Sequence, residues 1–256
     1  MRRFVRSIVL GGFLCLAAAP SFAQLATGGK HVADTASPKF EKQDPNNKDA
    51  KPEIQKGFLA RHESFNKRVK EGKVDLLFIG DSITQGWEGA GKSVWSKLYT
   101  PRNAVNLGIG GDRTQHVIWR LQNGNIDGIK PKAAVVMIGT NNGSDSADQV
   151  ADGITAVVAE LRKKLPETKV LILGIFPRGE KPNGGREKND KVNAVVAKLA
   201  DDKNVFYLDI GPKFLGENET ISKDIMPDYL HLSPKGYEIW GDAIEPTLKK
   251  LLGEQS

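Results

Sequence analysis

Short apolar runs rich in β-branched residues alternate with amphipathic stretches along most of the chain. The apolar runs are residues 74–79, 104–107, 133–138, 170–175 and 205–208. The amphipathic stretches are residues 93–99, 114–122, 147–165, 186–200 and 234–252. Continuous apolar strands separated by helices are typical of βαβ units, in which a parallel sheet is buried on both faces. We therefore predict an α/β fold, a three-layer α/β/α sandwich with a five-stranded parallel sheet.

The N-terminus has a different pattern. Residues 1–6 carry three arginines and no acid, residues 8–19 form an apolar run, and small residues end this segment at Ala23. This order is typical of a signal peptide, so we predict cleavage near Ala23 and a periplasmic or secreted location. A membrane anchor is the alternative, but the apolar run is shorter than the ~20 residues that a spanning helix uses.

The signal peptide, residues 1–23, is followed by a segment rich in Lys, Asp, Asn, Pro and Gly. This segment, residues 24–52, predicts a polar flexible arm. Apolar residues then recur at helical spacing, at Ile54, Phe58, Phe65 and Val69. They predict a helix at the start of the folded domain, residues 53–256. The roughly 230 residues that remain after cleavage suit one α/β domain, and two small domains are the alternative.

Charge and cysteine content exclude several classes of function. The 256-residue chain has a formal charge of +6, and loss of the three leader arginines lowers it to +3. The remaining lysines are scattered, so no nucleic-acid partner is expected. The single cysteine, Cys15, lies in the leader. The sequence has no His-Glu-x-x-His motif and no Cys/His cluster, so we expect no metal site and no cofactor.

Ser82 is the candidate nucleophile. It directly follows a predicted strand, and ligands bind beyond the carboxyl ends of parallel strands. A serine that enters a helix there exposes its hydroxyl, and the adjacent backbone N–H groups can stabilise negative charge. The alternative is that Asp81 or Ser82 only caps the next helix.

A serine nucleophile needs a base, and His231 is the histidine best placed to supply it. His31 lies in the arm, and His62 and His116 fall on predicted helices, where packing or a surface position is expected. His231 precedes a helix whose start Ser233 and Pro234 mark as N-cap and first residue. Asp228, three residues upstream, can orient the imidazole and stabilise its charged form. An Asp-x-x-His pattern by itself is common by chance.

Donors for a developing oxyanion follow two other predicted strands. The glycine-rich segment 108–112 allows the backbone to approach a ligand closely. Asn141 offers a neutral side-chain amide. A glycine-rich turn and a turn-forming asparagine pair are the structural alternatives. Together, however, the strand ends bring a nucleophile, donors and an Asp–His pair toward one edge of the sheet.

Four segments of the sequence resemble the conserved blocks of the SGNH (GDSL) hydrolase superfamily. They are GDSIT at 80–84, NLGIGGD at 106–112, GTNN at 139–142 and DYLHLS at 228–233. Residues 110–121 and 177–189 are similar in particular to the catalytic subunits of the type Ib platelet-activating-factor acetylhydrolase group. The resemblance covers nearly all of the chain from the first predicted helix onward. That group is cytosolic and lacks a leader, whereas this chain is predicted to be exported. The resemblance therefore does not determine the alcohol portion of the substrate.

The resemblance implies a flavodoxin-like fold and a role for each matching residue. Ser82 would be the nucleophile, His231 the general base and acid, and Asp228 its orienting carboxylate. The Ser82 and Gly111 N–H groups and the Asn141 amide would form the oxyanion hole. Three further positions would narrow the acyl pocket, and their bulk implies a short, acetyl-sized acyl group. These substrate-binding residues are Ile83, Thr140 and Leu230.

Residues 86–93 match the phosphate-loop pattern G-x-x-x-x-G-K-[ST], which indicates a nucleotide-binding protein instead. That loop requires a strand that runs straight into the first glycine, and here the strand has already ended. We therefore favour a glycine-rich loop before a short helix. A basic cluster, Arg178, Lys181, Arg186 and Lys188, is expected to be a solvated rim, and substrate contact is its alternative.

Together these features predict an exported serine esterase that hydrolyses short-chain, acetyl esters through an acyl-enzyme. An O-acetylated carbohydrate is the leading substrate, and a phospholipid-like ester, as for an acetylhydrolase or lysophospholipase, is the alternative. A non-catalytic carbohydrate-binding domain is a third reading. The expected partners are a small-molecule or polysaccharide ester, with no nucleic acid and no stable membrane anchor. The sequence leaves a homodimer open.

Overall fold

The computed structural model describes residues 32–37 and 52–255. Its centre is a five-stranded sheet with the order β2-β1-β3-β4-β5, in which every neighbouring pair is parallel. The strands are β1 (Leu76–Gly80), β2 (Ala104–Gly108), β3 (Ala133–Met137), β4 (Lys169–Leu173) and β5 (Val205–Leu208). The predicted three-layer α/β/α fold with a five-stranded parallel sheet is confirmed.

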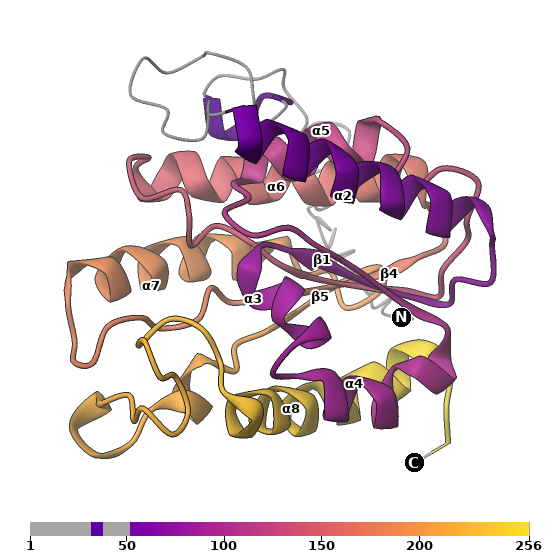
Figure 1. Cartoon of the computed structure of the whole chain (residues 1–256). Coiled ribbons are helices and arrows are strands. Elements are labelled where there is room, and N and C mark those ends of the chain that lie inside the picture. Colours follow the sequence, from indigo (N-terminus) through magenta and orange to yellow (C-terminus); the bar gives the residue numbers. More distant parts are fainter. Residues whose placement is uncertain (1–31, 38–51, 256) are drawn as a thin grey trace, which may run out of the picture.

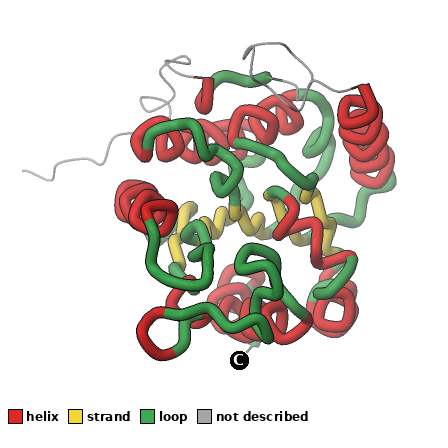
Figure 2. Tube along the Cα trace, turned by 60° about the vertical axis from the view of Figure 1, so that its left-hand side comes forward, coloured by secondary structure: helices red, strands yellow, loops and turns green. Residues whose placement is uncertain are grey.

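Helices cover both faces of this sheet, as Figures 1 and 2 show. On one face lie α2 (Pro52–Lys70), α5 (Thr114–Gln122), α6 (Ala147–Lys164) and α7 (Gly184–Val196). On the other face lie α4 (Lys92–Leu98) and α8 (Pro234–Leu252). The short helix α3 (Ser82–Gln85) directly follows β1.

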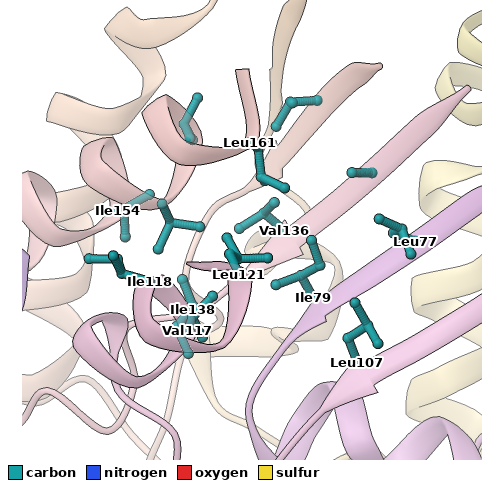
Figure 3. Packing of buried hydrophobic residues seen from close by; sticks show 14 of the residues in the cluster. Leu77, Ile79, Leu107, Val117, Ile118, Leu121, Val136, Ile138, Ile154 and Leu161 are labelled. Atoms are coloured by element: carbon teal, nitrogen blue, oxygen red, sulfur yellow. The ribbon is translucent and has the colours of Figure 1, made fainter. Parts of the chain in front are cut away.

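Alternation along the strands divides the core into two clusters. In β1, Leu77 and Ile79 point toward α5 and α6, whereas Leu76 and Phe78 point toward α4 and α8. Figure 3 shows the first cluster, to which Ile79 of β1 and Leu121 of α5 both belong. Because successive side chains of a strand point to opposite faces, a sheet covered on both faces must be apolar at nearly every position.

Side-chain caps explain where two helices begin. Ser233 Oγ accepts from the Gly236 N–H at 3.2 Å, and Pro234 is the first helical residue of α8, as predicted. Helix α7 begins two residues before the predicted start at 186. The Asn183 side chain caps it there by accepting from the N–H groups of Gly185 and Arg186.

Residues 32–37 differ from the predicted flexible arm. Val32–Asp34 is a 3-10 helix that packs against α5 and α6, and Ala33 is fully buried. The Thr114 hydroxyl donates to the Ala33 carbonyl at 2.6 Å. A side chain at Gly153 would come within 2.5 Å of that carbonyl, so the close approach depends on a glycine in α6. The predicted signal peptide, His31 and the rest of the arm lie outside the described residues.

Candidate active site

The carboxyl end of β1 presents Ser82. Strand β1 ends at Gly80, where an added Cβ would lie 2.1 Å from Thr84 Oγ1 and 2.3 Å from the Met137 carbonyl oxygen. The chain therefore turns tightly out of the sheet and into α3. Asp81 caps this helix, because its Oδ1 accepts from the Ile83 N–H at 2.9 Å. Capping and exposure of a hydroxyl thus belong to different residues: Asp81 is buried, and Ser82 is partly exposed.

His231 and Asp228 lie beside this serine. Ser82 Oγ is 2.9 Å from His231 Nε2, and His231 Nδ1 is 2.6 Å from Asp228 Oδ2. The structure therefore brings together the three residues that the sequence analysis proposed as nucleophile, base and orienting carboxylate. Ser82 and His231 are 149 positions apart along the chain, whereas Asp228 and His231 are 3 positions apart.

A turn in the left-handed region folds Asp228 back onto His231. Tyr229 has φ +59°, a conformation that costs a residue other than glycine of order 1 kcal/mol and that is found at functional sites. With this turn, Asp228 Oδ1 accepts from the N–H groups of Leu230 at 3.1 Å and His231 at 2.7 Å. Partial burial acts to raise the pKa of the Asp228 carboxyl, but these hydrogen bonds and the one from the imidazole outweigh it, so the pKa is lowered.

The three predicted N–H donors follow three neighbouring strands of the sheet, β1, β2 and β3. Ser82 is the first residue of α3, and Gly111, with φ +74°, follows β2. The Gly111 N–H has no hydrogen-bond partner within the part of the chain that the structure describes. Asn141 follows β3, and its Nδ2 donates one hydrogen to the Asp112 carbonyl at 2.9 Å. This bond fixes the amide and leaves its second hydrogen for a ligand.

A buried arginine, Arg120, is hydrogen-bonded to the ends of these segments. Arg120 of α5 is fully buried, and its Nε donates to Asp112 Oδ2 at 2.8 Å. Its Nη1 donates to Asn125 Oδ1 at 2.9 Å and its Nη2 to the Gly80 carbonyl at 3.4 Å. One side chain therefore ties the end of β1 to Asp112, which follows Gly111 in the loop after β2 and whose carbonyl accepts from Asn141. Sequence reasoning did not identify Arg120.

Each predicted acyl-pocket residue is a sequence neighbour of a predicted site residue. Ile83 follows Ser82, Thr140 precedes Asn141, and Leu230 precedes His231. Ile83 and Thr140 are buried, and Leu230 is half-buried. Ile83 and Leu230 belong to the same apolar cluster. Their role in limiting the acyl group stays a prediction.

Three residues of the basic cluster hold loops together instead of forming a solvated rim. Arg178 Nη1 donates to the Thr140 carbonyl at 3.0 Å, and Lys188 Nζ donates to the Asn142 carbonyl at 2.7 Å. Arg186 is only 6% exposed and donates to the carbonyls of Arg178, Gly179 and Glu219. Only Lys181 is exposed as expected. The sequence carries no local mark of this role, because the partners are main-chain carbonyls.

The other described histidines are structural. His62 of α2 is buried against the Trp119 ring, and burial lowers its pKa, as does the nearby charge of Arg120. His116 Nδ1 accepts from the Arg113 N–H at 3.0 Å at the start of α5. Both positions agree with the expected packing roles.

The glycine-rich segment 86–93 does not form a phosphate cradle. Gly86–Glu88 is a 3-10 helix, and α4 follows at Lys92. A side chain at Gly91 would lie 2.6 Å from the Trp87 ring and 2.8 Å from the Tyr237 ring, so this loop packs on the core. Gly86 and Gly91 allow close packing against aromatic rings, and the structure gives no support to the alternative of a nucleotide-binding protein.

Two residues near the site were not identified from the sequence. Gln85 Oε1 accepts from the Gly110 N–H at 2.7 Å. Arg61 of α2 donates from Nε to the Gly108 carbonyl at 2.7 Å and pairs with Glu88. Both hold the loop after β2. Gln85 could have been noticed, because it lies one helical turn after the nucleophile.

A serine, a histidine and an aspartate thus form one hydrogen-bonded row at the carboxyl edge of a parallel sheet, the arrangement of a serine hydrolase. Residues 78–239 match the model of the GDSL-like Lipase/Acylhydrolase family. The chain belongs to this family, and it is a carboxylic ester hydrolase.

Similar proteins agree with this classification. The platelet-activating factor acetylhydrolase IB subunit alpha1 of Rattus norvegicus is 43% identical over 198 residues, which cover 77% of this chain and 84% of the relative. The subunit alpha2 of Mus musculus is 41% identical over 201 residues, which cover 77% of this chain and 86% of the relative.

Solved structures share the fold. A GDSL-like lipase from Bacteroides thetaiotaomicron superposes with a TM-score of 0.61 at 22% identity, covering 76% of this chain and 97% of that one. A catalytic mutant of Axe2, an acetylxylan esterase from Geobacillus stearothermophilus, superposes with a TM-score of 0.54 at 21% identity, covering 70% and 94%. Within residues 32–37 and 52–255, no helix is both long and apolar enough to cross a membrane.

Proposed function

We propose that this protein is an exported serine esterase that hydrolyses short-chain, acetyl esters through an acyl-enzyme on Ser82. The observation that carries the proposal is the hydrogen-bonded row from Ser82 Oγ through both ring nitrogens of His231 to Asp228, with contacts of 2.9 and 2.6 Å. In this proposal residues 1–23 direct export and are removed, residues 24–52 form a polar arm, and residues 53–256 form the hydrolase domain.

The row supports a two-step reaction. With its proton on Nδ1, which faces Asp228, His231 accepts the Ser82 hydroxyl proton at Nε2 while Oγ attacks the ester carbonyl. The tetrahedral intermediate then collapses, and the departing alcohol takes the proton from Nε2. Water attacks the resulting acyl-serine by the same route and releases the acid. The sum is one ester and one water converted to one acid and one alcohol, and no metal or cofactor enters.

Charge on the intermediate would be stabilised by the N–H groups of Ser82 and Gly111 and by the Asn141 amide. A positioned donor of this kind contributes most in the transition state, because the charge develops only there. Support comes from the Gly111 N–H, which has no partner among the described residues, and from Asn141, which the Asp112 carbonyl holds in place.

The acyl group is proposed to be short because the acyl-pocket residues are bulky and adjoin the reacting groups. For the alcohol portion we propose an O-acetylated carbohydrate. This agrees with the leader-like pattern of residues 1–23 and with the fold shared with an acetylxylan esterase. A phospholipid-like ester is the second candidate, favoured by the relatives that are named platelet-activating factor acetylhydrolase subunits and are about 42% identical.

The first experiment compares Ser82→Ala with Ser96→Ala. Ser96 is an exposed serine of α4 and is the matched control. With p-nitrophenyl acetate, Ser82→Ala should lose essentially all turnover, whereas Ser96→Ala should keep wild-type turnover. Full activity of Ser82→Ala would rule out the proposed nucleophile.

The second experiment compares two substrates at equal acetyl concentration. Acetate release from O-acetylated xylan and from an acetylated lysophospholipid should favour the polysaccharide. A preference for the lipid would support the second candidate and overturn the first. Detection of the mature chain in the periplasm or culture medium, starting near residue 24, tests the proposed export.

A further inference from the structure

Gln85 ends the helix that begins with Ser82. Because the two residues are three positions apart, their side chains lie on the same side of α3. The Gln85 side chain is partly exposed, and its Oε1 accepts from the Gly110 N–H at 2.7 Å. Its Nε2 has no hydrogen-bond partner within the described part of the chain. This side chain therefore makes one directed contact, and that contact is with the loop after β2.

The loop in question needs a restraint from outside. Gly110 and Gly111 are consecutive glycines, and such a pair has many backbone conformations of similar energy. The peptide between them carries the Gly111 N–H, whose direction changes when either residue rotates. The Gly110 N–H belongs to the preceding peptide, so a hydrogen bond to it fixes where the glycine pair starts and leaves fewer directions for the Gly111 N–H.

The loop also runs close to the nucleophile. A Cβ built on Gly110 would lie 3.4 Å from Gln85 Oε1 and 3.8 Å from Ser82 Cβ. The base of α3 is joined to β2 as well, since Asn106 Nδ2 donates to the Thr84 carbonyl at 3.0 Å. Ser82, its own N–H and the acceptor for Gly110 thus belong to one short helix.

We propose that Gln85 is a positioning residue of the oxyanion hole, which holds the Ile109–Gly110 peptide and so limits the direction of the next N–H, that of Gly111, to one that faces the carbonyl attacked by Ser82. The inference rests on the proposed function. Gln85 does not touch the substrate in this role. It contributes by keeping two donors, those of Ser82 and Gly111, in a fixed geometry before the charge develops.

The test uses Gln85→Met, which keeps the length of the side chain and removes the acceptor. Gln122→Met is the matched control, because it removes a glutamine hydrogen bond to Glu160 at the C-terminal end of α5. For each variant, kcat and KM are measured with p-nitrophenyl acetate. Affinity is measured for phenylboronic acid, which forms a tetrahedral adduct with a nucleophilic serine. Thermal unfolding and near-UV circular dichroism report the folded fraction.

In Gln85→Met we expect kcat to fall about tenfold, less than the 10²–10³ that follows complete loss of one oxyanion donor. Boronate affinity should fall by a similar factor, KM should stay within about twofold, and the folded fraction should be unchanged. Gln122→Met should match the wild type in all kinetic values.

Two results would overturn the inference. One is a Gln85→Met enzyme with wild-type kcat and boronate affinity. The other is a loss of kcat that parallels loss of the folded fraction, with boronate affinity per folded molecule unchanged. Ser82→Ala, assayed alongside, separates the proposals: an active Ser82→Ala enzyme defeats the proposed function, whereas an inactive one beside a normal Gln85→Met enzyme defeats only the role of Gln85.

Discussion

Replacement of Asp81 by asparagine should stabilise the protein at neutral and alkaline pH but not in acid. Asp81 is fully buried and immediately precedes Ser82 as the N-cap of α3. Its Oδ1 accepts from the Ile83 N–H, and its Oδ2 has no partner in the described structure. Asparagine keeps the shape and the capping oxygen, because Asn and Asp are comparable N-caps. The substitution therefore removes the ability to ionise and little else.

Burial raises the pKa of the Asp81 carboxyl from 3.8 to about 7. The negative charge of Asp112 acts in the same direction, and the hydrogen bond from the Ile83 N–H opposes it. Between these two pH values the folded protein keeps a proton that the unfolded chain has lost. The stabilisation that protonation provides is therefore complete below about pH 4 and is lost as the pH rises to about 7.

The size of this effect follows from the pKa difference. A shift of about 3 units at about 1.36 kcal/mol each corresponds to about 4 kcal/mol. Asp81→Asn does not titrate, so its free energy of unfolding should equal that of the wild type near pH 4. The difference should grow to about 4 kcal/mol in favour of the variant by pH 8.

The assay is urea unfolding, followed by the fluorescence of the four tryptophans, at pH 4, 5.5, 7 and 8.5. Asp202→Asn is the control, because this aspartate is exposed in the turn before β5 and its replacement should change stability by no more than about 0.5 kcal/mol. A difference between Asp81→Asn and the wild type that is equal at pH 4 and pH 8.5 would refute the reasoning.

Three further predictions follow from the same structure. His231→Ala should lower kcat by several orders of magnitude with the protein still folded, and a stopped-flow assay showing near-normal acylation would contradict the base assignment. Across acetate, butyrate and octanoate p-nitrophenyl esters, kcat/KM should fall with chain length, and a preference for octanoate would show that the acyl-pocket residues do not limit the acyl group. A Gly→Ala change inside a helix usually stabilises a protein by about 1 kcal/mol, but Gly153→Ala should lower the Tm because the added Cβ would collide with Ala33 and Thr114. A raised Tm would show that residues 32–37 do not dock there.

Local pattern was sufficient for the elements and for the chemically important strand ends. The apolar runs gave strands within two residues of their observed limits, since the sheet is covered on both faces and most strand positions are apolar. Ser82, Gly111 and Asn141 could be found because they follow strands, and parallel strands place their carboxyl ends at one edge. The start of α8 followed from Ser233 and Pro234, because capping is a local interaction.

Tertiary structure decided what depends on contacts between distant segments. The sheet order places β1 between β2 and β3, and nothing within one apolar run states which strand will be its neighbour. Arginine is usually a surface residue, yet Arg186 and Arg120 are buried because carbonyls and a carboxylate from other segments accept their hydrogen bonds. Residues 32–37 belong to a segment of arm-like composition, and their docking depends on the space above Gly153 and on the hydrogen bond from Thr114. Composition and periodicity describe each segment's preference for water or core, whereas burial of a charge depends on partners that arrive from elsewhere in the chain.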